Sequence, residues 1–297
     1  MFEKNLYQGQ RVLITGGGTG LGFAMARKLA SLGAEVHLCG RRLAVLEQAV
    51  DALQAEFGCQ AFGHALDIRS AENVTQVVEH IWQQHGPLTA LINNAAGNFV
   101  SRTEDLSPNA FHAISDIVFR GTFYVTQAVG RKWIAGQLPG AVLSIVVTWV
   151  DTGAPFVVPS AMSKAGLDAM TKSLAVEWGP KRIRLNAIAP GVIPTQGASS
   201  RLRPDVKGNE DSADQRRLDN PTRRLGTGDD IGNLAAYILA PENTWLNGQT
   251  ITLDGGDALA NGAYFTDYQA WDDEDWASAK QKAKSANPSA NSQEQGA

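Results

Sequence analysis

The chain has 297 residues, of which 43% are hydrophobic and 19% charged, and its formal net charge is −4. This composition is typical of a globular protein, and the slightly acidic balance argues against a nucleic-acid partner. The two cysteines, Cys39 and Cys59, exclude a disulfide framework and fit a reducing compartment. The sequence has no apolar leader, no apolar run of membrane-spanning length and no peroxisomal signal at its end, so we expect a soluble, cytoplasmic protein without a membrane partner.

Short apolar runs alternate with helical patterns along the chain. The apolar runs predict strands at 12–14, 36–39, 61–66, 90–92, 142–147, 183–187 and 249–253. The helical patterns lie at 23–32, 43–57, 71–84, 109–133, 161–178 and 229–239. This alternation predicts an α/β fold, a single domain with a Rossmann-like, doubly wound parallel sheet and helices on both faces.

Residues 1–257 are expected to form this domain, followed by an aromatic and acidic extension at 258–285 and a disordered tail at 286–297. Within the domain, the polar segment 198–224 follows a strand end and is interpreted as a substrate lid, the alternative being a surface excursion. The aromatic side chains of the extension are expected to dock on the body or on a neighbouring subunit rather than to contact ligand. They are Tyr264, Phe265, Tyr268, Trp271 and Trp276.

The strongest local pattern is a glycine-rich turn, Thr15 to Gly22, between the first strand and the first helix. A pyrophosphate needs close approach to the backbone and free N–H donors at a helix N-terminus, and glycine allows both. The pattern predicts a dinucleotide site, although a turn without a ligand is the alternative. The predicted binding residues of this turn are Gly16, Gly18, Thr19, Gly20, Leu21 and Gly22.

The end of the second strand predicts which dinucleotide binds. A carboxylate at this position would favour NAD, but the chain has Gly40 followed by Arg41 and Arg42. Guanidinium groups suit a 2′-phosphate, so the prediction is NADPH; the alternative is that both arginines are solvated. At the end of the third strand, Asp67, next to Ile68, is a candidate acceptor for the adenine amino group or a cap for the following helix.

Three further motifs are Asn93-Asn94-Ala95-Ala96-Gly97, Ser160-Ala161-Met162-Ser163-Lys164 and Pro190-Gly191. Together with the glycine-rich turn, they make the chain resemble the short-chain dehydrogenase/reductase family over residues 8–257. The resemblance implies that Asn93 steadies the sheet, that Lys164 holds the nicotinamide ribose, and that residues 190–195 cover the nicotinamide amide and the pyrophosphate. The further cofactor residues that it implies are Asn94, Ala95, Ala96, Gly97, Lys164, Pro190, Gly191, Ile193 and Thr195.

Within this family the chain is most similar to the 2,4-dienoyl-CoA reductases of mitochondrial and bacterial type. The similar stretches are 92–99, 106–110, 157–160 and 174–179, together with the aromatic tail. Most family members have Tyr-x-x-x-Lys on the catalytic helix, whereas this chain has Ser160-x-x-x-Lys164, as dienoyl-CoA reductases do. The resemblance implies hydride transfer from NADPH to an α,β-unsaturated or 2,4-dienoyl-CoA thioester, which is protonated on carbon.

Three positions depart from the resemblance. Trp149 stands where the reductases have a tyrosine, Arg120 where they have an asparagine, and Val147 where other family members have Ser or Thr. Donors aimed at the thioester oxygen are worth about 3–4 kcal/mol each, and Trp149, Thr148 and Arg120 are candidate donors beside the catalytic candidates Ser160 and Lys164. The alternative interpretation makes Trp149 a packing residue and Arg120 an ion-pair partner.

Two other functions stay open at this point: reduction of another carbonyl or an imine, and nucleotide binding without turnover. The family resemblance implies a homotetramer that acts on a small, acyl-CoA-like molecule. No metal is predicted, because the histidines have no metal-ligand spacing. They are His37, His64, His80, His85 and His112.

Overall fold

The computed structural model describes residues 1–195, 202, 219–261, 265, 268 and 270–285. Within this part of the chain, one sheet of parallel strands has the order β3-β2-β1-β4-β5-β6-β7. The strands are β1 (Arg11–Thr15), β2 (Glu35–Gly40), β3 (Ala61–Ala65), β4 (Ala90–Asn93), β5 (Gly140–Ile145), β6 (Ile183–Pro190) and β7 (Thr250–Leu253). The order reverses between β1 and β4, which confirms the doubly wound sheet.

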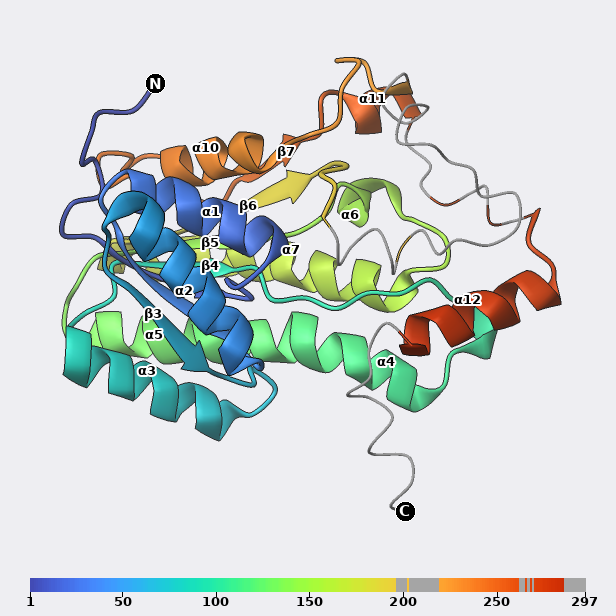
Figure 1. Ribbon diagram of the computed structural model, residues 1–297, viewed down its shortest axis with the longest axis horizontal. Coiled ribbons are helices and arrows are strands. Elements are labelled where there is room, and N and C mark those ends of the chain that lie inside the picture. Colours follow the sequence, from blue (N-terminus) through green and yellow to red (C-terminus); the bar gives the residue numbers. More distant parts are fainter. Residues whose placement is uncertain (196–201, 203–218, 262–264, 266–267, 269, 286–297) are drawn as a thin grey trace.

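Helices cover both faces of this sheet, as predicted (Figure 1). One face carries α1 (Gly20–Ser31), α2 (Leu43–Phe57) and α10 (Gly228–Leu239). The other face carries α3 (Ala71–His85), α5 (Thr122–Ala135) and α7 (Val158–Trp178). Each face has its own buried cluster of apolar side chains. The central strands are therefore covered on both sides, which explains why their sequences are continuous apolar runs rather than alternating apolar and polar residues.

Local hydrogen bonds set where several helices begin. Ser70 caps α3 by accepting a hydrogen bond from the backbone N–H of Asn73 at 3.1 Å. Thr227 and Asp230 form a capping box at the start of α10, in which each side chain accepts from the other residue's backbone N–H. These caps satisfy N–H groups that have no partner within the helix.

The long helix predicted at 109–133 is interrupted. It consists of α4 (Pro108–Ser115), a π-helical turn η2 (Asp116–Gly121) and α5. Extra residues of this kind inside helices occur frequently at functional sites. Shorter helical segments that the sequence did not predict are η1 (Thr103–Asp105), α6 (Trp149–Thr152), η3 (Gly179–Lys181) and α11 (Asp257–Asn261).

The C-terminal extension contains a further helix, α12 (Asp273–Ser285), which lies at the outer end of the molecule beyond α4 (Figure 1). Tyr268 and Trp276 are buried in an aromatic cluster, and Arg102 forms an ion pair with Asp273 at 2.6 Å. The extension therefore docks on the body of its own subunit, one of the two expected arrangements. Of the expected lid, only Leu202 and residues 219–224 are described, and residues 286–297 lie outside the described part.

Candidate active site

A cavity of about 830 Å³ opens at the carboxyl ends of the strands. Its walls come from the segments that follow β1, β2, β3, β4, β5 and β6, so it spans the point where the strand order reverses. Open α/β sheets bind ligands at this position because the loops on either side of the reversal diverge and leave a crevice. The cavity is therefore the candidate active site.

The glycine-rich turn forms one wall of the cavity and depends on two close backbone approaches. Gly16 has a φ of +64°, and a Cβ atom there would lie 3.0 Å from the backbone of Ala95. A Cβ at Gly22 would lie 2.4 Å from the carbonyl oxygen of Gly16. Larger residues at either position would push the turn away from the segment after β4.

Hydrogen bonds hold this turn to the segment after β4. The hydroxyl of Thr15 accepts from the backbone N–H groups of Asn94 and Ala95 at 3.0 and 3.1 Å. The side-chain amide of Asn94 donates to the carbonyl oxygens of Thr15 and Gly16. Asn93, one residue earlier, is buried and donates to the Thr126 hydroxyl at 2.8 Å, which ties β4 to α5. The two binding segments are thus built as one unit.

Nearly all the predicted cofactor residues line the cavity. They are Gly16, Gly18, Thr19, Gly20, Leu21, Arg41, Arg42, Asp67, Ile68, Asn94, Ala95, Ala96, Gly97, Lys164, Pro190, Gly191, Ile193 and Thr195. Gly22 is the exception: it is buried behind the turn, against Gly16. Its role is to permit the shape of the turn rather than to face the cavity.

The rim after β2 and β3 is charged. Arg41 and Arg42 line the cavity beyond Gly40, and Asp67 lies across from them after β3. The Asp67 carboxylate pairs with the Arg69 guanidinium at 2.5 Å, and this hydrogen bond holds the pKa of Asp67 below its usual range. Asp67 is therefore ionised, and Ser70 rather than Asp67 caps α3.

Two buried polar side chains of α7, Ser160 and Lys164, line the cavity. Lys164 is 5% exposed, and its ammonium group donates a hydrogen bond to the carbonyl oxygen of Ile145 at the end of β5. Burial disfavours its charged form and lowers the pKa of Lys164 to about 8. Ser160 lies one helical turn earlier, so the two side chains share a face of α7.

Aromatic side chains form another part of the cavity wall. Trp149, on α6, is 9% exposed and packs edge-on against Phe265 of the C-terminal extension, with ring centroids 5.7 Å apart. Both rings line the cavity, and so does Leu202, whose carbonyl oxygen accepts a hydrogen bond from the Tyr268 hydroxyl at 2.5 Å. Phe265 thus docks on Trp149 of the body, as expected for the extension, and it also lines the cavity.

The structure does not bring Arg120 or Thr148 to the cavity wall. Arg120 is 58% exposed, and its guanidinium bonds to Asp116 and to the Tyr124 hydroxyl, each four residues away on η2 and α5. Positions 116, 120 and 124 share the outward face of this helical segment, whereas Ile117 faces the cavity. The contacts of Arg120 therefore match the second of its two interpretations, an ion-pair partner, and do not support the role of oxyanion donor. Thr148 is buried next to Trp149 but is not among the lining residues.

Sequence reasoning missed several apolar lining residues. They are Val45, Leu46, Ile117, Val147, Leu202 and Phe265, among others. Val45 and Leu46 could have been found from their place in the first turn of α2, three and four residues after Arg42. No local pattern marks Ile117 or Phe265, because their orientation follows from the π-helical turn and from the packing of the extension.

Among the described residues, no helix has both the length and the apolar character needed to cross a membrane.

Comparison with known proteins places these features in a family. The sequence profile of the enoyl-(acyl carrier protein) reductase family matches residues 16–257. A Caenorhabditis elegans protein named probable 2,4-dienoyl-CoA reductase 3 is 42% identical over 274 residues, which cover 91% of this chain and 87% of that protein. A Bacillus subtilis protein named probable 2,4-dienoyl-CoA reductase is 41% identical over 250 residues, which cover 84% and 96%.

Solved structures agree with the sequence relatives. The crystal structure of a short-chain dehydrogenase from Bacillus anthracis superposes with a TM-score of 0.77 at 39% identity, covering 85% of this chain and 98% of that one. The fold with the seven-stranded parallel sheet is thus shared with a solved short-chain dehydrogenase. The chain belongs to the short-chain dehydrogenase/reductase family and is an oxidoreductase that uses a nicotinamide cofactor.

Proposed function

We propose that the protein is an NADPH-dependent reductase of 2,4-dienoyl-CoA thioesters or related α,β-unsaturated thioesters. The observation that carries the proposal is the pair Ser160 and Lys164 on one face of α7 in the cavity, with no tyrosine at position 160. A carbonyl reductase needs a hydroxyl that releases its proton near neutral pH, and the pKa of a serine is too high for that. A substrate that is protonated on carbon has no such need. The names of the C. elegans and B. subtilis relatives support the same substrate class.

The cavity fits a phosphorylated dinucleotide. Gly16 and Gly20 line the cavity and have positive φ values of +64° and +56°, a backbone shape that suits close approach of a pyrophosphate to the start of α1. Arg41 and Arg42 line the cavity where the adenosine ribose of a dinucleotide would lie, and a guanidinium pair favours a 2′-phosphate over a free hydroxyl. When bound, NADPH supplies the hydride. The chain's contribution is to bind it, orient it and exclude water.

Three side chains that line the cavity outside the glycine-rich turn have separate roles in this proposal. Lys164 places a buried positive charge in the middle of the cavity, which favours the anionic character that a conjugated thioester gains on reduction. The Ser160 hydroxyl donates a hydrogen bond to the thioester oxygen or holds a water that delivers the proton. Trp149 offers an indole N–H and a flat wall against which a planar conjugated chain can stack.

The direct test is an assay of NADPH oxidation with 2,4-dienoyl-CoA substrates of several chain lengths. We expect turnover with NADPH and much weaker turnover with NADH. The Arg41→Ala, Arg42→Ala double variant should lose about 100-fold or more in NADPH affinity, because it removes two partners of the 2′-phosphate and hydrogen bonds to charged groups contribute about 1.5–3 kcal/mol each, and it should keep its NADH affinity. Arg131→Ala, at an exposed arginine on α5, is the matched control.

Two outcomes would overturn the proposal. Tight NADPH binding without turnover of any thioester would favour a nucleotide-binding protein, and turnover of ketones or imines but not of thioesters would favour a different reductase. Equal use of NADH and NADPH would remove the cofactor assignment but leave the thioester assignment standing. The three arms therefore separate cofactor choice, substrate class and catalysis.

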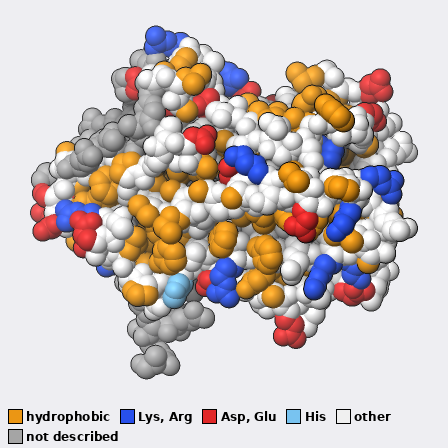
Figure 2. Space-filling view, turned by 180° about the vertical axis from the view of Figure 1, so that it is seen from behind, with side chains coloured by type: hydrophobic (Ala, Val, Ile, Leu, Met, Phe, Trp, Pro, Cys, Tyr) orange, Lys and Arg blue, Asp and Glu red, His pale blue; other side chains and the backbone are white. Residues whose placement is uncertain are grey.

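We further propose that the protein is a cytoplasmic homotetramer. Phe119 and Phe123, on η2 and α5, and Met162 and Val176, on α7, are exposed by 43–80%. Viewed from behind, the molecule exposes hydrophobic side chains between scattered charged groups (Figure 2). Both cysteines are unpaired, which fits a reducing compartment. Light scattering on the purified protein tests the assembly: a tetramer is expected, and Phe123→Glu should dissociate it, whereas a monomeric wild type would contradict the proposal.

A further inference from the structure

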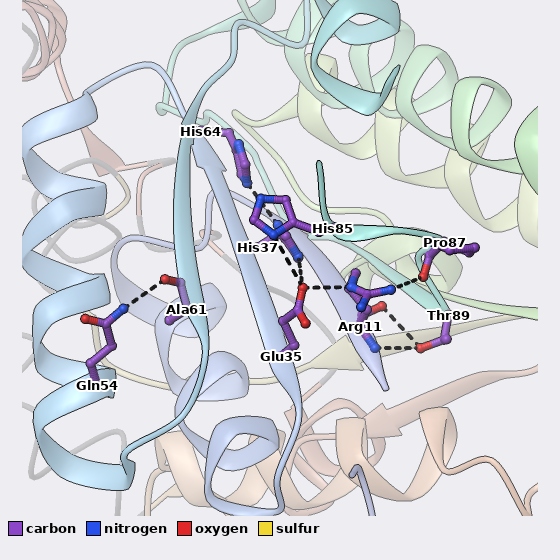
Figure 3. A network of polar contacts seen from close by, with 9 residues as sticks. All are labelled: Arg11, Glu35, His37, Gln54, Ala61, His64, His85, Pro87 and Thr89. Atoms are coloured by element: carbon purple, nitrogen blue, oxygen red, sulfur yellow. Dashed lines mark hydrogen bonds and ion pairs between the residues drawn. The ribbon is translucent and has the colours of Figure 1, made fainter. Parts of the chain in front are cut away.

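Four of the five histidines lie together, away from the cavity. His37 lies on β2, His64 on β3, and His80 and His85 on α3. The His37 ring stacks on the His64 ring with centroids 5.2 Å apart and meets the His85 ring edge-on at 4.8 Å. Figure 3 shows these rings converging beside the carboxylate of Glu35. The elements that carry them are separated in sequence, so only the fold brings the rings together.

Two of these histidines, together with Glu35, present possible metal-ligand atoms to one point. Glu35 Oε1, His37 Nε2 and His85 Nδ1 all lie within 4.8 Å of one another. Glu35 Oε1 is 2.8 Å from His37 Nε2 and 3.9 Å from His85 Nδ1. A metal ion with tetrahedral bonds of about 2.0–2.2 Å holds neighbouring ligand atoms about 3.3–3.6 Å apart, so binding needs a small movement of His85 and a free oxygen on Glu35. His37 is fully buried, and Glu35 and His85 are 16% and 20% exposed, so the three ligands are already largely ordered.

The second nitrogen of His37 also has a partner suited to this role. His37 Nδ1 lies 2.9 Å from His64 Nε2. Without a metal, His37 Nε2 donates to Glu35 Oε1 at 2.8 Å. A metal ion would displace that proton, and the His37 ring would then keep its proton on Nδ1 and donate it to His64. Metal-binding histidines are regularly held in this way, by a hydrogen bond from the nitrogen that does not bind the metal.

Arg11 opposes a cation at this point but does not block it. Its Nε donates to the same oxygen, Glu35 Oε1, at 2.7 Å, and its Nη1 donates to the Pro87 carbonyl oxygen. A carboxylate has two oxygens, so Glu35 can hold a metal with one and the guanidinium with the other. The nearby positive charge lowers the affinity relative to a structural zinc site, and the bonds to Arg11 and His37 keep Glu35 satisfied when no metal is bound.

We propose that Glu35, His37 and His85 bind a divalent transition-metal ion of the zinc and nickel class, with His64 orienting the His37 ring. Imidazole nitrogens with one carboxylate suit these metals, whereas Mg²⁺ prefers an all-oxygen set. The bound ion links the start of β2 to the last residue of α3. None of the three ligands is among the described residues that line the cavity, so the ion stabilises the fold and takes no part in the reduction.

The test is calorimetric titration of chelator-treated, full-length protein with Zn²⁺, Ni²⁺ and Mg²⁺. We expect saturable binding of Zn²⁺ and Ni²⁺, no binding of Mg²⁺, and a rise in the melting temperature with Zn²⁺. His85→Gln, at a partly exposed position, should weaken Zn²⁺ binding at least about tenfold, because it removes one of three protein ligands, and should abolish the thermal shift. His80→Gln on the same helix and His112→Gln on α4 are the matched controls.

Each result decides the proposal. Absence of saturable Zn²⁺ binding, or unchanged binding in His85→Gln, would overturn it, and so would an equal loss in His80→Gln or His112→Gln. Circular dichroism of each variant confirms that the comparison is made between folded proteins. Substitution with Co²⁺ gives a second readout, since a visible d–d spectrum in the wild type that is absent from His85→Gln reports imidazole coordination independently of affinity.

Discussion

The two ends of the cavity are built in different ways. At the cofactor end, the wall consists of short segments that directly follow strands, such as Gly16 to Leu21 after β1 and Asn94 to Gly97 after β4. At the substrate end, Trp149, Leu202 and Phe265 come from distant parts of the chain and meet through side-chain packing. Backbone shape therefore defines the first end and long-range packing defines the second, so substitutions should affect them differently.

The largest effect is expected from Gly22→Val. The new side chain would collide with the Gly16 carbonyl oxygen and the Asn94 amide and force the glycine-rich turn away from the segment after β4. We expect the dissociation constant for NADPH to rise about a hundredfold or more, equivalent to about 2.7 kcal/mol. Fluorescence titration with NADPH measures this change.

Gly179→Ala is the matched control, because a Cβ there would lie 3.6 Å from the Asn247 side chain in ordinary contact. It should bind NADPH like the wild type. Unchanged NADPH binding in Gly22→Val would contradict the view that the shape of the glycine-rich turn depends on the backbone packing behind it.

This contrast explains what the sequence could predict. Strands, glycines and the residues after each strand are local patterns, and parallel strands bring their carboxyl ends to one edge, so the cofactor end followed from the sequence. The sequence could not decide between the two interpretations of Arg120, because no spacing pattern marks the π-helical turn that contains it. Phe265 was missed as a lining residue because nothing local specifies where the extension packs.

Lys164 lies between the two ends and should make the reaction depend on pH. Burial lowers its pKa from 10.5 to about 8, so in the free enzyme it is charged below pH 8 and loses its proton above it. If the charge is needed, kcat/KM stays level below pH 8 and falls about tenfold per pH unit above it. The pH profile of kcat/KM for NADPH measures this dependence.

Lys164→Arg keeps a positive charge over the whole range, so the decline of kcat/KM above pH 8 should disappear even though the overall rate is lower.

The effect of Lys164 on the free energy of unfolding has the opposite pH dependence to its effect on the rate. Its pKa is lower in the folded than in the unfolded protein, so stability gains as pH rises from about 8 towards 10.5. A rate that fell in parallel with stability would indicate unfolding rather than loss of this charge.

Phe265→Ala tests the substrate end by itself. The substitution removes an aromatic contact with Trp149 and opens the cavity wall. We expect KM for the thioester to rise about fivefold, since such aromatic contacts are worth about 1 kcal/mol, with the dissociation constant for NADPH unchanged. Steady-state kinetics and the NADPH titration measure the two quantities. Phe57→Ala, at the end of α2 and outside the lining residues, should change neither of them.

The smallest effect is expected from Asp230→Asn, which separates stability from ligand binding. Asp230 accepts hydrogen bonds from Thr227 and Arg224 at the start of α10, and α10 packs against α1, the helix that follows the glycine-rich turn. The amide keeps a weaker cap and loses the ion pair, so we expect the free energy of unfolding to fall by about 0.5–1 kcal/mol, with no change in NADPH affinity. Urea denaturation at several pH values measures this difference.

The pH dependence of that difference identifies its cause. Hydrogen bonding to Arg224 lowers the pKa of Asp230 to about 2, below its ordinary value near 3.8. A carboxylate with a lowered pKa stabilises the fold fully above its ordinary pKa and loses this contribution as pH falls through the folded-state value. The gap between wild type and Asp230→Asn should therefore be constant near neutral pH and shrink between about pH 4 and pH 2. A gap that did not shrink with acid would assign the effect to the shape of the cap rather than to its charge, and a change in NADPH affinity would show that the cofactor end depends on distant packing after all.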